Sequence, residues 1–117
     1  MAKMYQLSNC KTCQRILDEL GEQPRLEVTN IKATPIRPEE LDRMAALAGS
    51  YEALFSRRAM KYRSMGLADQ PLTEADYRRL ILEEYTFLKR PVTVVGDQIF
   101  IGSAKKSVEG TRKALTR

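Results

Sequence analysis

The fold of this chain is organised around the stretch Ser8-Asn9-Cys10-Lys11-Thr12-Cys13-Gln14-Arg15, which holds both cysteines of the protein. An alternating run of residues, Met4-Tyr5-Gln6-Leu7, precedes it and predicts a short strand. From Cys13 onward, apolar residues recur with the spacing i, i+3, i+4 and i+7, which predicts a helix that stops at Gly21. The predicted order is therefore strand, Cys-x-x-Cys, helix, with Cys10 at or just before the helix N-terminus.

Cys10 is the candidate nucleophile. At a helix N-terminus, the unpaired backbone N–H groups and the positive end of the helix dipole favour a bound anion. A thiolate is such an anion, and Lys11 adds a neighbouring positive charge. We therefore expect Cys10 to be nucleophilic at neutral pH.

Cys13 has two interpretations that the sequence leaves open. Because it lies on the apolar stripe, it can be a small buried hydrophobic residue, as free cysteines often are. Alternatively it is a resolving thiol, since positions i and i+3 of a first helical turn bring two sulfurs towards disulfide distance. No metal site is expected, because one Cys-x-x-Cys supplies only two of four ligands and the chain has no histidine.

The composition limits the kinds of protein that this chain can form. At 117 residues, 43% hydrophobic and 30% charged, the chain is expected to form one soluble globular domain. It has no apolar run of about 18 residues and no charged-then-apolar leader, so neither a membrane span nor a secretory signal is expected. Two cysteines without a wider disulfide framework suit a reducing cytoplasm.

Charge and histidine content narrow the chemistry. The net charge of +5 allows an anionic partner, but no motif supports direct sequence-specific DNA binding. The absence of histidine excludes Ser-His-Asp and Cys-His hydrolases and histidine general acid–base catalysis. Catalysis would have to use thiols, carboxylates, lysine and arginine.

The rest of the chain completes an α/β pattern. A second strand at 26–31 follows the first helix closely, so the two strands should be parallel neighbours. A mainly helical region of about 38–88 comes next, and it contains four cations in seven residues, namely Arg57, Arg58, Lys61 and Arg63. A hairpin at 92–101 with a Gly96-Asp97 turn and a final amphipathic helix with Ala104, Val108, Thr111 and Leu115 on one side end the chain. This order predicts a thioredoxin/glutaredoxin-like mixed four-stranded sheet flanked by helices, with a helical insertion between strands 2 and 3.

Together these residues resemble the arsenate reductase (ArsC) family, including its Spx and YffB branches, over nearly the whole chain. The resemblance rests on four features in the family's order and spacing. They are Asn9-Cys10 after the first strand, Ser56-Arg57-Arg58 followed by Tyr62, Leu88-Lys89-Arg90-Pro91, and Ile101-Gly102 before the last helix.

The resemblance implies roles for individual residues. Cys10 would be the nucleophile, and Arg58 and Arg90 would hold an oxyanion substrate or stabilise the thiolate, with Arg57 as the neighbouring alternative to Arg58. Pro91 would form a cis peptide bond with Arg90 and shape the thiol loop. No cofactor would be bound, while glutathione or another thiol would be the reductant and glutaredoxin or thioredoxin a partner.

Two departures from the family pattern bear on function. Ser103 stands where the glutathione-coupled arsenate reductases carry a third arginine, which argues against arsenate as the physiological substrate. Cys13 is absent from those reductases but present in the Spx regulators, which bind RNA polymerase; the chain ends at Arg117 without the longer tail of that branch. We therefore expect a thiol-dependent reductase, arsenate reductase-like or a related thiol-disulfide oxidoreductase, with an Spx-like redox-sensing regulator as the alternative.

Overall fold

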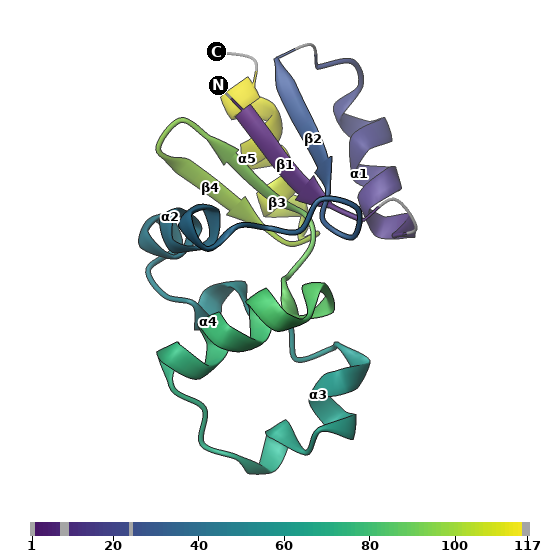
Figure 1. The fold of residues 1–117 in the computed structure, drawn as a ribbon. Coiled ribbons are helices and arrows are strands. Elements are labelled where there is room, and N and C mark those ends of the chain that lie inside the picture. Colours follow the sequence, from purple (N-terminus) through teal and green to yellow (C-terminus); the bar gives the residue numbers. More distant parts are fainter. Residues whose placement is uncertain (1, 8–9, 24, 116–117) are drawn as a thin grey trace. The chain divides into compact units, whose positions relative to one another are not determined.

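A computed structural model describes residues 2–7, 10–23 and 25–115, so Ser8 and Asn9 of the central stretch lie outside the described residues. The chain divides into two compact units (Figure 1). Unit 1 comprises Met1–Thr34 and Arg90–Arg117, and unit 2 comprises Pro35–Lys89. Unit 2 therefore has nearly the bounds predicted for the helical insertion. That the two units form a single domain stays a prediction.

Unit 1 is built on a four-stranded sheet with the order β2-β1-β3-β4. The strands are β1 (Ala2–Gln6), β2 (Leu26–Asn30), β3 (Val92–Val95) and β4 (Gln98–Ile101). The strand β1 is parallel to β2 and antiparallel to β3, and β3 and β4 form an antiparallel hairpin. The predicted α/β class, mixed sheet and strand directions are thus confirmed.

Two helices of unit 1 cover one face of this sheet, α1 (Lys11–Leu20) and α5 (Lys105–Leu115). A buried cluster of Met4 from β1, Ile16 and Leu20 from α1, and Val108 from α5 joins them to the sheet. Helix α1 ends at Gly21, which has a φ of 70° and therefore a conformation that favours glycine. Cys10 and the helix that follows it are consequently anchored by the apolar stripe that the sequence predicted.

The packing of α5 differs from the prediction at one residue and depends on one glycine. Ala104, predicted to face inward, is exposed because it precedes the first turn of the helix. At Gly110 a Cβ atom would lie 2.6 Å from Cε1 of Phe100 on β4. The helix therefore approaches the hairpin closely only because this position carries no side chain.

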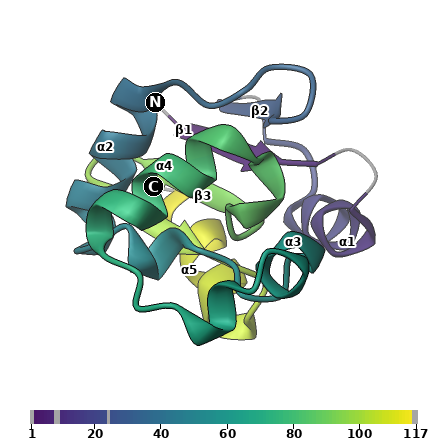
Figure 2. The same cartoon turned by 60° about the horizontal axis from the view of Figure 1, so that its bottom comes forward.

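Unit 2 is built mainly from helices and 3₁₀ turns and is best followed in Figure 2. Its helices are α2 (Pro38–Ala48), α3 (Met60–Ser64) and α4 (Glu74–Glu83), and its 3₁₀ turns are η1 (Glu52–Leu54), η2 (Leu67–Asp69) and η3 (Tyr85–Phe87). Helix α2 begins at its proline and ends at Gly49, which is left-handed with a φ of 98°. Helix α4 begins at Thr73, whose hydroxyl accepts the backbone N–H of Asp76. Each of these limits carries a residue type that favours a helix end.

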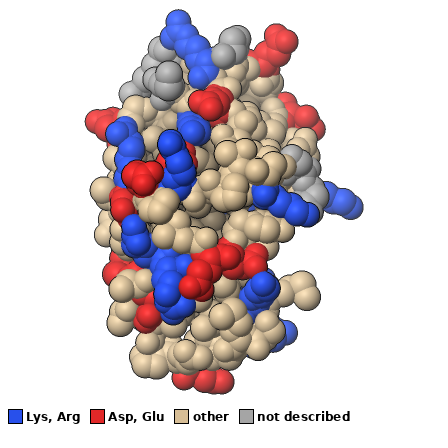
Figure 3. Space-filling view, in the orientation of Figure 1, with Lys and Arg blue, Asp and Glu red and all other residues tan. Residues whose placement is uncertain are grey.

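Two properties of the described residues are the length of their helices and the distribution of charge on the face drawn in Figure 3. In the described ranges, no helix has the length and apolar character needed to cross a bilayer. On the face drawn in Figure 3, the Lys and Arg side chains are interspersed with Asp and Glu. The net charge of +5 is therefore not gathered into one basic patch on this face.

Candidate thiol site

Cys10 is the residue that begins α1. Its backbone is extended, with φ of −91° and ψ of 109°, and it is the N-cap residue of the helix. Its sulfur accepts a hydrogen bond from the backbone N–H of Cys13 at 3.3 Å. The half-buried Cys10 sulfur thus takes the capping position that a serine or aspartate oxygen takes in other helices, where a negative charge is favoured.

Cys13 is completely buried and lies against Cys10. The two sulfur atoms are 2.8 Å apart, with the Cys13 thiol donating to the Cys10 sulfur, and both cysteines are free thiols. Burial, reinforced by the hydrogen bond to Cys10, raises the pKa of the Cys13 thiol to about 11. Cys13 therefore stays protonated at neutral pH and serves as a donor to Cys10.

Arg90 and Pro91 belong to the same unit as the two cysteines. The Arg90–Pro91 peptide bond is cis, the isomer that the family resemblance implied. The carbonyl of the buried Pro91 accepts the N–H of Gly102 at 2.9 Å, which ties it to the end of β4. The positive charge of Arg90 acts on Cys13, lowering its pKa against the larger effect of burial. Within unit 1, the charge of Arg90 thus acts on the Cys13 thiol.

The other two candidate arginines belong to unit 2, and the structure distinguishes them. The guanidinium of Arg57 is held by the Glu52 carboxylate at 2.7 Å and by the Tyr77 hydroxyl at 3.1 Å. Arg58 is exposed and makes no hydrogen bond or ion pair with any described residue. It lines a groove of about 770 Å³ together with Met60 and other residues of this segment. Arg58 is therefore the better placed of the two to receive an anion, and its convergence with Cys10 stays a prediction.

Ser103 lies at the end of a pocket that the sequence did not predict. This pocket, of about 340 Å³, lies between α1 and α5 and also includes Arg15, Glu19 and Lys105. Arg15 belongs to the stretch of residues 8–15 that contains both cysteines. The spacing of apolar residues in α1 does not indicate which residues of α5 lie near its polar side. The signal would have been the packing of two helices that are separated by about eighty residues.

The two cysteines are expected to react at very different rates with iodoacetamide. Cys10 is partly exposed, whereas Cys13 is buried and has a pKa of about 11, so its thiolate is scarce below that pH. Peptide mapping after short exposure at pH 7 should find the label on Cys10. Labelling of Cys13 should rise as the pH approaches 11, and equal labelling of both cysteines at pH 7 would contradict the assignment.

The sheet order β2-β1-β3-β4, with a cysteine pair opening α1, defines a thioredoxin-like thiol protein. Residues 5–111 match the model of the ArsC family. The chain belongs to the ArsC family.

Individual relatives agree with this family membership. The uncharacterized protein YusI of Bacillus subtilis (strain 168) is 25% identical over 111 residues, which cover 90% of this chain and 92% of YusI. Among solved structures, the YFFB (PA3664) protein superimposes with a TM-score of 0.80 at 25% identity, covering 98% of this chain and 99% of the other. An arsenate reductase from Vibrio cholerae gives a TM-score of 0.79 at 21% identity, covering 93% and 95% of the two chains, and shares the fold.

Proposed function

We propose that this chain is a thiol-dependent reductase that uses Cys10 as its nucleophile and acts on a small oxyanion or on a thiol-disulfide substrate. The observation that supports this best is the Cys10 sulfur at the start of α1 with the Cys13 thiol 2.8 Å from it. A free dithiol of this kind persists in a reducing compartment, so a cytoplasmic location is part of the proposal.

The chemistry of the oxyanion reaction can be written with arsenate as the example. The Cys10 thiolate attacks arsenic, and arsenate loses one oxygen as water, leaving an S–As bond. A second thiol then attacks the Cys10 sulfur; a disulfide forms, and arsenic leaves with the bonding electron pair as arsenite. Arg58 and Arg90 would bind the oxyanion, because guanidinium groups are permanently charged planar donors that suit its oxygens.

The second thiol is Cys13 or an external thiol such as glutathione. If Cys13 resolves the intermediate, mild peroxide treatment should form a Cys10–Cys13 disulfide, because the two sulfurs are already in contact. Mass spectrometry should then show a loss of about two daltons on the peptide that holds both cysteines, and Cys13→Ala should prevent it. If sulfenic or sulfinic acid instead accumulates on Cys10 of the unchanged protein, an external thiol and not Cys13 resolves the Cys10 intermediate.

Substitution of Arg58 should weaken oxyanion binding. We expect Arg58→Ala to reduce the binding free energy of arsenate or sulfate by roughly 1.5–3 kcal/mol, the value of a charge-assisted hydrogen bond. The matched control is Arg63→Ala, which removes the same charge from the same groove. Isothermal titration should find Arg63→Ala close to the unchanged protein; equal losses in both variants would indicate a general charge effect.

The decisive experiment for the activity compares two substrates. Reduction of arsenate and of hydroxyethyl disulfide is followed with glutathione, glutathione reductase and NADPH. Because Ser103 occupies the position of a third arginine, arsenate turnover should be slow or absent while the disulfide is reduced. If the protein accelerates neither reaction above the rate without protein, the proposal that it is a reductase is contradicted.

The second candidate function is a redox-sensing regulator that contacts RNA polymerase, favoured by the close approach of Cys10 and Cys13. A dithiol that closes to a disulfide can report oxidation without turning over a substrate. A pull-down with purified RNA polymerase, with the protein reduced and then oxidised, tests this candidate. Redox-dependent capture without reductase activity would favour it over the enzyme.

A further inference from the structure

The α3 groove is the groove of about 770 Å³ on unit 2 that residues between positions 57 and 68 line. Its apolar lining comes from Ala59, Met60, Tyr62 and Ala68. The side chain of Met60 is 89% exposed. A groove of this volume lies in the range of protein sites that enclose a ligand, and exposed methionines are frequent at surfaces that bind partners. The α3 groove is therefore a candidate binding surface.

The charged side chains that line the α3 groove are all basic. They are Arg57, Arg58 and Arg63, and the described lining contains no aspartate or glutamate. Arg57 pairs with Glu52 at 2.7 Å, whereas Arg58 and Arg63 are exposed and have no ion-pair partner in the described ranges. Unit 2 as a whole carries equal numbers of acidic and basic side chains. The positive charge is thus local to the groove, and it is complementary to a ligand that carries carboxylates.

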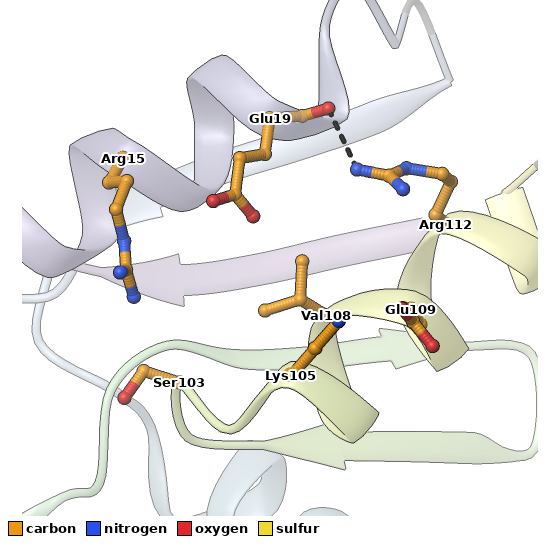
Figure 4. A pocket seen from close by; sticks show the side chains of 7 residues that line it. All are labelled: Arg15, Glu19, Ser103, Lys105, Val108, Glu109 and Arg112. Carbon is orange, nitrogen blue, oxygen red and sulfur yellow. Dashed lines mark hydrogen bonds between the residues drawn. The ribbon is translucent and has the colours of Figure 1, made fainter.

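The pocket between α1 and α5 has a different distribution of charge (Figure 4). There Arg15 and Lys105 line the same space as Glu19 and Glu109. A ligand with carboxylates would be repelled by two of these side chains, whereas the described lining of the α3 groove has no negative charge to repel it. Of these two hollows, the α3 groove is the one that suits an acidic ligand.

The apolar lining indicates a protein segment and not a nucleic-acid strand. Proteins hold single strands with cations that follow the phosphates and with aromatic rings on which the bases stack. Tyr62 is the one aromatic residue in the described lining, and it packs edge-on against the buried ring of Phe55 at 5.9 Å between centroids. Ala59 and Met60 supply aliphatic groups. Such a surface suits the apolar side chain of a peptide.

We propose that the α3 groove is a docking surface for a partner protein and binds a short acidic segment of that partner. An apolar side chain of the segment lies against Met60, and carboxylates on either side of it pair with Arg58 and Arg63. This inference goes beyond the reductase activity, because Met60 and Arg63 have no part in the oxyanion site proposed above. Docking therefore does not require the Cys10 thiol.

The test measures the binding of fluorescein-labelled synthetic peptides by fluorescence anisotropy at low salt, where charge pairs are least screened. The main probe is Glu-Glu-Leu-Phe-Glu-Glu, which combines carboxylates with apolar side chains. One comparison peptide has glutamine in place of every glutamate, and the other has serine in place of leucine and phenylalanine. Both should bind more weakly than the main probe, because the groove offers positive charge and apolar contact together.

Arg63→Gln should weaken binding of the acidic peptide about fivefold, the upper range for one exposed ion pair. Met60→Ala should weaken it about fivefold as well, through the loss of apolar contact. The matched controls are Arg25→Gln and Met65→Ala, which change exposed side chains of the same kinds that do not line the groove. Both controls should bind like the unchanged protein. Cys10→Ser should also bind the peptide unchanged, so this result is independent of the reductase.

Several outcomes would overturn the proposal. They include no saturable binding of the acidic peptide, equal affinities for all three peptides, and equal losses in Arg63→Gln and Arg25→Gln. Tighter binding of labelled oligothymidylate than of the acidic peptide would show that the groove binds nucleic acid instead. A dimer in light scattering that Met60→Ala converts to a monomer would show that a second copy of this chain occupies the groove.

Discussion

Replacing Phe55 by alanine is expected to lower the free energy of unfolding by about 3–5 kcal/mol, the usual cost of removing a buried aromatic side chain. Phe55 is completely buried and packs its ring against Phe87 at 5.0 Å and Tyr77 at 4.9 Å between centroids. The cavity would lie at the centre of unit 2. Because Arg58 follows Phe55 by three residues, this variant should also weaken oxyanion binding.

Urea unfolding followed by circular dichroism measures this loss, since the chain has no tryptophan for fluorescence. Met60→Ala is the control: it also removes an apolar side chain from unit 2, but Met60 is 89% exposed, so its effect should stay within about 0.5 kcal/mol. A loss below about 1 kcal/mol for Phe55→Ala would show that the aromatic cluster does not stabilise unit 2 as its burial indicates.

The elements that the sequence predicted correctly are those with local signals at their ends. Helix α1 has an apolar stripe and a terminal glycine, and α4 has the reciprocal cap between Thr73 and Asp76. The direction of β2 followed from the short crossover after β1, which permits only a parallel pair. Each of these features depends on residues that are close together in the sequence, so the sequence of this chain is sufficient to predict it.

The segment from Tyr51 to Leu67 could not be predicted because its structure depends on distant residues. Helix α3 has only five residues, too few to form without tertiary contacts. All four cations of the basic run are exposed, which is the usual state of such a run. Two of them are also paired: Arg57 donates to the Tyr77 hydroxyl, twenty positions away, and Lys61 pairs with Glu84 at 2.7 Å. No local pattern encodes these pairings.

The candidate site also combines features that local sequence predicts with features that depend on distant residues. The position of Cys10 as the N-cap residue of a helix could be predicted from the strand–helix boundary, whereas the cis bond between Arg90 and Pro91 could be expected only from the resemblance to a family. The two interpretations of Cys13 proved compatible in the structure: it is completely buried and its sulfur also contacts Cys10. Burial and hydrogen bonding together set its pKa, and neither can be read from spacing alone.

Replacing Cys10 by serine should abolish the proposed reductase activity, lowering it by roughly a thousandfold or more to the rate without protein. A serine hydroxyl is not ionised at neutral pH and needs a base to attack. The chain contains no histidine to act as that base. Serine is also among the best N-cap residues, so α1 should form as before and thermal unfolding should change little.

The matched variant is Cys13→Ser, which makes the same atomic change one helical turn later. With glutathione in excess it should keep most of the activity, because an external thiol can replace Cys13 in the resolving step. Without an external monothiol, and with a dithiol-disulfide protein as the reductant, it should lose activity if Cys13 resolves the intermediate. Comparable activity in Cys10→Ser and the unchanged protein would refute Cys10 as the nucleophile, since no other described thiol is accessible to a substrate.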